Sequence, residues 1–456
     1  MRELLCETCE RAVRFLESLP TRRVAAFRDA GELAQALDGE LPPSGLPASE
    51  VIARLDEIGS QGTVASAGPR YFGFVVGGAL PAPLAANWLA AAWDQNAFSE
   101  VSSPIGAALE RVAMRWTLQI LDLPADAGVA LVTGATMANF TALGAARRNV
   151  LLAHGHDVDR HGVQAAREIT VVVGEQAHVS IFKSLGMLGL GRDRVIRVPA
   201  DDQGRMRATA LPVLNGPAIV CAQAGNVNTG AFDPVDAICD AVRADDVWVH
   251  VDGAFGLWAR ASSQFAGLSN GLERADSWAT DAHKWLNVPY DSGLAIVRDA
   301  NSLRGVMSME AAYLPDRTSR DPFEFTPESS RRIRGVEIWA AIASLGLEGI
   351  RLLVERNCRQ ARRFADGLRD AGNEVLNEVV LNQVLVEFGD DRTTADVIRG
   401  VQRDGTCWCG ETNWGGRTAM RISVSSWATT DEDVERSLAA ILRIADDVRA
   451  QPRLGG

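Results

Sequence analysis

The sequence predicts an α/β protein built around a mostly parallel sheet. From residue 129 onward, short apolar runs recur without alternating polar residues, which is typical of strands buried on both faces. Helical patterns and loops rich in Gly, Asp and Asn separate these runs, which favours parallel strands joined by helices. The expected strands are Val129–Thr133, Ile169–Val173, Val195–Val198, Ala218–Ala222, Val247–Val251, Ser277–Thr280 and Gly293–Val297.

Length and composition narrow the class of protein. The chain has 456 residues, 47% of them apolar and 23% charged, so it can bury a large core without disulfides or metal. Its formal net charge of −12 argues against nucleic acid or a membrane surface as a partner. No apolar run has the roughly 18 residues of a membrane span, and the first 20 residues are too charged for a signal peptide. We therefore expect a cytoplasmic protein.

Metal binding is not expected. The seven cysteines form an odd set, and Cys6-x-x-Cys9 has no standard second pair of ligands. The histidine-rich stretch at His154–His161 is explained more simply as a polar surface connection.

Three segments are expected along the chain. Residues 1-75 have helical patterns around a Pro/Gly-rich loop, and residues 76-328 contain all seven apolar runs. Residues 329-456 predict a smaller α+β domain, and residues 301-330, rich in proline and charge, predict a mobile active-site loop. In the last segment we expect helices at Gly349–Ala371, Thr393–Arg403 and Asp431–Val448, and strands at Val379–Phe388 and Ala419–Ser426.

Lysine is rare in this chain. Of 46 basic residues, 44 are arginine and two are lysine, namely Lys183 and Lys284. Arginine can replace lysine as a solubilising cation, but it cannot perform amine chemistry because its pKa stays too high. Lys284 follows an expected strand end, where ligands bind in α/β sheets, whereas Lys183 lies in an expected helix as an ordinary surface amine. Lys284 is therefore the preferred reactive amine.

Two further strand ends carry polar groups. Asp252 ends the strand Val247–Val251, either as a turn or capping residue or as a carboxylate in the same crevice as Lys284. An Asp and a Lys in this arrangement are typical of pyridoxal phosphate (PLP) enzymes, where the Asp pairs with the ring nitrogen. Thr133–Thr136 follows another strand and opens a helix, which is a common type of phosphate site.

Four motifs together carry a resemblance to a known family. The combined pattern resembles the group II pyridoxal-phosphate-dependent amino-acid decarboxylases, which include aromatic-L-amino-acid, histidine and glutamate decarboxylases. The likeness covers nearly the whole chain. The motifs are Thr133–Asn139, Gln176–His178, His250–Ala254 and His283–Tyr290.

This resemblance implies PLP-dependent fold type I, the aspartate aminotransferase-like fold, and assigns roles to residues. Lys284 would hold the cofactor as a Schiff base, Asp252 would pair with the ring nitrogen, and His178 and Ala254 would lie on the two ring faces. Further cofactor contacts are implied for Ala135, Thr136, Asn226, Asn228, Asp281 and His283, and substrate-pocket walls for Phe74 and Trp93.

The implied reaction is decarboxylation of an L-amino acid to the amine and CO2, with an aromatic substrate slightly favoured. The family's loop tyrosine has no counterpart in Arg320–Pro327, so Tyr313, His178 or water would supply the proton. Relatives with Phe at that position can form an aldehyde through O2, so oxidative deamination stays an alternative, as does a PLP-dependent aminotransferase. A homodimer with active sites at the interface is also implied.

Overall fold

The chain forms two compact units. The computed structural model describes residues 1–242, 246–308 and 320–451. The large unit comprises Gly77–Arg362 and Asn377–Val384, and the small unit comprises Met1–Val76, Arg363–Leu376 and the chain from Leu385 onward.

The segments predicted from the sequence correspond only partly to these units. The first predicted boundary lies one residue from the end of Met1–Val76, but the large unit continues far beyond residue 328. Contacts in the large unit explain this: the Trp285 indole donates to Asn357 at 3.1 Å, and the Ser262 hydroxyl donates to Glu355 at 2.6 Å.

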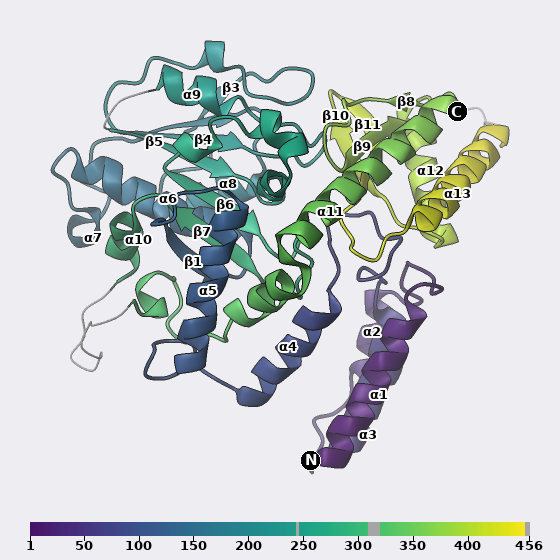
Figure 1. Cartoon of the computed structure of the whole chain (residues 1–456). Helices are drawn as coiled ribbons and strands as arrows, with labels where there is room; N and C mark the ends of the chain where they lie inside the picture. The colour runs from purple at the N-terminus through teal and green to yellow at the C-terminus, as the bar shows by residue number, and fades with distance from the viewer. Residues whose placement is uncertain (243–245, 309–319, 452–456) are drawn as a thin grey trace. The chain divides into compact units, whose positions relative to one another are not determined.

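A seven-stranded sheet forms the centre of the large unit (Figure 1). The strand order is β1-β7-β6-β5-β4-β2-β3, and only β7 runs against its neighbours β1 and β6. All seven predicted strands are present, each within one residue of its predicted bounds. They are β1 (Gly128–Val132), β2 (Thr170–Gly174), β3 (Ile196–Val198), β4 (Ala218–Gln223), β5 (Val247–Asp252), β6 (Ser277–Asp281) and β7 (Gly293–Val297).

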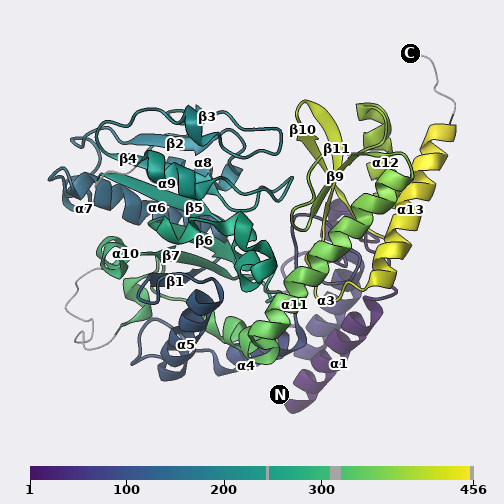
Figure 2. The same cartoon turned by 45° about the horizontal axis from the view of Figure 1, so that its top comes forward.

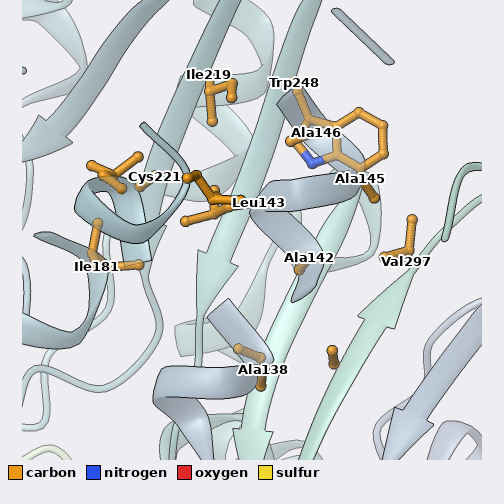
Figure 3. Packing of buried hydrophobic residues seen from close by; sticks show 14 of the residues in the cluster. Ala138, Ala142, Leu143, Ala145, Ala146, Ile181, Ile219, Cys221, Trp248 and Val297 are labelled. Carbon is orange, nitrogen blue, oxygen red and sulfur yellow. The ribbon is translucent and has the colours of Figure 1, made fainter. Parts of the chain in front are cut away.

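Helix α6 (Ala135–Leu152) packs closely against this sheet because its contact face is made of small side chains. Ala138, Ala142, Ala145 and Ala146 are fully buried and let the helix axis approach the strands. Figure 3 shows this cluster, in which Leu143 of α6 and Ile219, Cys221, Trp248 and Val297 of the strands complete the packing. The close approach brings the start of α6 to the carboxyl ends of the strands.

Of the other helices, α7, α8 and α9 lie in connections between strands of the sheet, α4 and α5 precede its first strand, and α10 and α11 follow its last. Helix α11 contains a break at Gly346, which has a positive φ of 61°. The helices are α4 (Pro81–Trp93), α5 (Pro104–Ile120), α7 (Val158–His161), α8 (Val179–Met187), α9 (Val235–Ala241), α10 (Ala300–Met307) and α11 (Gly335–Asp370), with 3-10 turns at Ala208–Ala210, Gly256–Ala261, Ser263–Ser269, Leu272–Arg274 and Pro322–Glu324.

Helix α10 corrects the prediction of a loop over residues 301-330. The Asp299 carboxylate caps the helix by accepting hydrogen bonds from the backbone N–H groups of Asn301 and Ser302, both at 3.1 Å. Buried Leu303 then packs into the core that α6 forms with the sheet. The predicted proton donor Tyr313 lies outside the described residues.

The small unit contains a second sheet, of order β10-β11-β9-β8 (Figure 2). Strands β9 and β11 fall in predicted regions, but β8 and β10 were missed because β8 has two residues and the interior of β10 is polar. In the described parts of the chain, no helix is both long and apolar enough to cross a bilayer. The elements are α1 (Arg2–Ser18), α2 (Ala30–Leu37), α3 (Ala48–Gly62), β8 (Glu374–Val375), β9 (Gln383–Glu387), α12 (Asp391–Asp404), β10 (Gly410–Trp414), β11 (Arg417–Ser423) and α13 (Asp431–Ala450).

A buried ion pair anchors the chain that leads into α11. Both terminal nitrogens of Arg331 donate to the Glu110 carboxylate, each at 2.7 Å, and both side chains are almost completely buried. Burial also lowers the pKa of Arg320 to about 10, and the charge of Glu110 opposes this shift. Glu110 therefore compensates the buried guanidinium of Arg331 and acts on the charge of the partly buried Arg320.

Removing this carboxylate is expected to destabilise the protein strongly. We predict that Glu110→Gln lowers the free energy of unfolding by about 3–5 kcal/mol, because a buried cation is left unpaired. The matched control is Glu100→Gln, since Glu100 pairs with Arg111 at the surface and should contribute about 0–1 kcal/mol. Urea denaturation followed by tryptophan fluorescence measures both, and equal losses would contradict the prediction.

Candidate active site

A cavity of about 330 Å³ opens at the carboxyl ends of the strands in the large unit. Loops and turns that follow β1, β2, β4, β5 and β6 all contribute to its wall, as expected for a ligand site of an α/β sheet. The lining residues are Thr133, Gly134, Ala135, Thr136, Met137, His178, Ser180, Gln223, Gly225, Val227, Asp252, Ala254, Phe255, Asp281, His283 and Lys284.

Lys284 lies in this cavity, three residues after β6 ends. Its Nζ is 3.3 Å from Oδ2 of Asp281. The backbone of Lys284 is held by a close approach of Gly77, where a Cβ would lie 1.8 Å from the Lys284 carbonyl oxygen. By contrast, Lys183 is exposed on α8 and does not line the described cavity. Of the two lysines, Lys284 is therefore the one positioned for chemistry.

Asp281 and His283 form a polar cluster beside this amine. Oδ2 of Asp281 is also 3.5 Å from Nε2 of His283, while its buried Oδ1 has no hydrogen-bond partner among the described residues. The other ring nitrogen of His283, Nδ1, accepts from the backbone N–H of Ser292 at 3.2 Å, and Tyr290 packs on the ring at 4.3 Å between centroids. Burial lowers the pKa of His283, which favours its neutral form at pH 7.

Asp252 occupies the end of β5 and is 5% exposed. Oδ2 accepts from Nδ2 of Asn139 at 3.1 Å and from the Ser180 hydroxyl at 3.3 Å. Oδ1 accepts from the backbone N–H of Ala254 at 3.2 Å. Donors from three different elements thus fix the orientation of a buried carboxylate that faces the cavity.

The start of α6 lies at the cavity and has no side-chain cap. Gly134 precedes the helix, and no side chain caps the terminus, so the backbone N–H groups of the first turn stay available. A Cβ at Gly134 would lie 3.2 Å from Cε1 of His283 and 3.6 Å from Oδ1 of Asp281, so a larger residue would narrow the space at this terminus.

His178 caps α8 and reaches the same cavity. Its Nδ1 accepts from the backbone N–H of Ser180 at 3.3 Å. The Ser180 hydroxyl lies 2.8 Å from the same nitrogen and 3.3 Å from Oδ2 of Asp252, so its single proton can be donated to either acceptor. The site therefore brings together most of the residues proposed from the sequence. These are Ala135, Thr136, His178, Asp252, Ala254, Asp281, His283 and Lys284.

Asn226, Asn228, Phe74 and Trp93, also proposed from the sequence, are not among the residues that line this cavity. Asn226 closes a turn by accepting from the backbone of Asn228 at 2.8 Å, and the neighbouring Gly225 and Val227 line the cavity in their place. The proposed pocket walls also lie outside its described lining: Trp93 is 41% exposed at the end of α4, and Phe74, 62% exposed, belongs to the small unit.

Four polar residues at or beside Asp252 and the cavity were not predicted from the sequence, namely Asn139, Ser180, His250 and Gln223. Three of them lie inside or beside the motifs quoted above. For one of these, His250, the sequence does contain an indication of buried partners. His250 interrupts an otherwise apolar strand, so its polar ring requires buried partners. The identity of those partners is visible only in the structure.

The site fits pyridoxal phosphate by three features. The uncapped helix start suits a phosphate, the Asp252 carboxylate suits a protonated ring nitrogen, and the amine of Lys284 suits an aldehyde. All three open into one cavity, and the small Ala254 leaves room beside them.

Comparisons with known proteins agree with this fit. The model of the pyridoxal-dependent decarboxylase conserved domain matches residues 31–388. The chain is 24% identical to an aromatic-L-amino-acid decarboxylase of Bacillus atrophaeus over 98% of this chain and 96% of the relative. It is 30% identical to an L-2,4-diaminobutyrate decarboxylase of Rhizobium meliloti (strain 1021) over 80% of this chain and 75% of the relative. The structure resembles Oryza sativa TDC, solved with PLP and tryptamine, with a TM-score of 0.91 at 22% identity, covering 98% and 97%.

The buried His250 gives the protein a specific acid sensitivity. Burial lowers its pKa from 6.5 to about 4, against an opposing effect of Asp252. The unfolded chain therefore takes up a proton near pH 6.5 that the native state does not bind until about pH 4, so stability falls as the pH falls through this window. Burial raises the pKa of Asp233 to about 7, so this residue makes stability rise as the pH falls. The contribution of His250 must therefore be measured as the difference between a His250 variant and the wild type.

We predict that His250→Gln removes this acid-sensitive contribution, which is on the order of 3 kcal/mol between pH 6.5 and 4. Urea denaturation of the variant and the wild type at several pH values measures the difference. The exposed His161 provides the control, because His161→Gln should leave the slope unchanged. An unchanged slope in His250→Gln would refute the prediction.

Proposed function

The chain belongs to the pyridoxal-dependent decarboxylase family, and we propose that it acts on an aromatic L-amino acid with Lys284 as the residue that holds the cofactor. Membership in this family establishes that the chain is a PLP-dependent carboxy-lyase that acts on amino acids. One observation carries the residue assignment: the amine of Lys284 and the carboxylate of Asp252 line the same cavity as the uncapped start of α6.

Each side chain has a physical role in this proposal. When bound, pyridoxal phosphate supplies a protonated ring that accepts the electron pair left as CO2 departs. Asp252 supplies the negative charge that favours the protonated ring nitrogen. Asp281 keeps Nζ of Lys284 in place and provides a local acceptor for its protons at 3.3 Å.

The helix start and the rings around it orient the cofactor. The first-turn N–H groups of α6 and its dipole favour a dianionic group at Ala135 and Thr136. His178 and Ala254 line the cavity next to Asp252, where a flat ring would be enclosed. His178 is held in place by its contacts with Ser180.

An aromatic substrate is supported by the relative of Bacillus atrophaeus, which matches over nearly its whole length. The diaminobutyrate relative has higher identity over a shorter span, so 2,4-diaminobutyrate is the second candidate substrate. The aldehyde-forming alternative and the aminotransferase are not favoured, because these relatives are decarboxylases. Tyr313, His178 and water remain the candidate proton donors.

A homodimer and a cytoplasmic location are also part of the proposal. Large apolar side chains remain exposed on helices of the large unit, and a second copy of the chain would cover them. They include Trp88, Leu89 and Trp93 on α4 and Trp339, Leu347 and Leu352 on α11. The free cysteines of the described chain, five of them buried, suit a reducing compartment.

The two lysines provide a matched test of the amine. Borohydride reduction of the PLP-loaded protein should attach the cofactor to the peptide that contains Lys284. We predict that Lys284→Arg abolishes this labelling and lowers decarboxylation by roughly 10²–10⁴-fold, while Lys183→Arg keeps both. Labelling at Lys183 would overturn the assignment.

The reaction itself is tested with a panel of amino acids. We expect an aromatic L-amino acid to yield CO2 and the amine in equal amounts, without peroxide or ammonia. Release of CO2 with peroxide and ammonia would indicate oxidative deamination instead. If 2,4-diaminobutyrate is turned over faster than any aromatic amino acid, it becomes the proposed substrate. Consumption of a keto acid without CO2 release would indicate transamination.

A further inference from the structure

A line of buried polar side chains extends from the interior of the sheet to Asp252. At its far end, Nε1 of Trp248 donates to the hydroxyl oxygen of Ser277 at 2.8 Å. An indole N–H can only donate, so the Ser277 oxygen is an acceptor here and its own proton is free to be donated. Nδ1 of His250 lies 2.8 Å from this oxygen and, when unprotonated, accepts that proton.

The other end of the line imposes a condition independently. An ionised Asp252 can only accept, so the amide group of Asn139 that lies 3.1 Å from its Oδ2 is the NH2 group. The oxygen of the same amide then faces Nε2 of His250 at 2.9 Å. An oxygen can only accept, so Nε2 of His250 must carry a proton.

Both ends are thus satisfied by one state of His250, which is neutral with its proton on Nε2. The ring is fully buried. The same burial lowers its pKa to about 4, in agreement with a neutral imidazole, although the charge of Asp252 acts in the opposite direction. Every donor in the line has an acceptor, and all hydrogen bonds point toward Asp252.

We propose that Trp248, Ser277, His250 and Asn139 form a one-directional hydrogen-bond relay, and that His250 is a positioning residue that fixes Asp252 through Asn139. The proposal rests on the proposed function, in which Asp252 faces the cofactor ring nitrogen. Without the N–H of His250, the oxygen of Asn139 loses its donor, and the amide is held only by its NH2 group, through Asp252 and Ser180. A rotated amide would present an oxygen to the carboxylate and remove one of its donors.

The alternative is that His250 only fills space in the core. A space-filling role requires the volume of the ring but no particular protonation state. The relay requires a donor at the position of Nε2, so the two roles differ in a spectroscopic property that is independent of catalysis.

The first experiment measures the protonation state of His250 in the cofactor-free full-length protein. Solid-state ¹⁵N NMR of protein labelled at histidine distinguishes protonated from unprotonated ring nitrogens, and the chain has only six histidines. The His250→Gln variant identifies the His250 signals by their disappearance. We expect an unprotonated Nδ1 and a protonated Nε2 at pH 7. A proton on Nδ1, or on both nitrogens, overturns the relay whatever reaction the protein catalyses.

The second experiment compares His250→Gln with His250→Leu. The amide of Gln can donate to Asn139, whereas Leu has similar bulk and cannot. With the ring nitrogen of PLP labelled with ¹⁵N, we expect it to be protonated in wild type and His250→Gln and to lose protonation in His250→Leu. We also expect PLP affinity to fall at least tenfold in His250→Leu and to be largely rescued in His250→Gln.

The outcomes separate the relay from the proposed function. Equal ring protonation and equal affinity in the two folded variants would overturn the relay while leaving Lys284 and decarboxylation intact. Failure of borohydride labelling at Lys284 would instead remove the proposed function without altering the ¹⁵N result for His250. If His250→Leu does not fold, the protonation state of His250 in the wild-type protein still tests the relay.

Discussion

The negative charge of Asp252 is the constraint on which the rest of the site depends. An ionised carboxylate that is 5% exposed is tolerated only where donors replace the lost water. Those donors come from Asn139 on α6, Ser180 on α8 and the turn after β5. The two helices and the turn must therefore be placed correctly relative to one another. The charge that a cofactor ring would require therefore also ties the helices to the sheet.

The close packing of α6 makes this arrangement possible. Its alanine face brings Asn139 into the sheet interior and places the start of the helix at the mouth of the cavity. Two glycines permit the approach, since a Cβ on Gly293 would lie 2.5 Å from Cα of Gly134. The anion site and the donor to Asp252 are thus consequences of the same small residues.

The composition of the chain and the packing around Lys284 both set this amine apart from the other cations. In the described ion pairs, arginine supplies the cation at the surface, as in Arg443 with Asp404, while Lys284 pairs with Asp281 inside the cavity. Gly77 and the buried Trp285 hold the backbone on either side of this lysine. The backbone of Lys284 is therefore fixed by packing, while the residue lines the cavity.

The sequence by itself determined the seven-stranded sheet, because unbroken apolar runs can be buried only as interior strands or helices and these runs are too short for helices. It also determined that Lys284 and Asp252 stand at strand ends, where an α/β sheet binds ligands. The family resemblance added the proposed roles of His178 and Ala254. Helix α10 and the polar strand β10 were missed, since a capping Asp and cross-strand pairing, rather than apolar patterns, define them.

Only the tertiary structure decided which polar residues surround Asp252. Asn139 and Ser180 precede it by 113 and 72 residues, and His250 reaches Asn139 across the interface between sheet and helix. A hydrogen bond depends on distance and direction to a partner, and these are fixed by how α6 and α8 pack on the strands. A linear pattern records that a histidine interrupts an apolar strand, but the fold alone decides what the histidine bonds to and which of its nitrogens carries the proton.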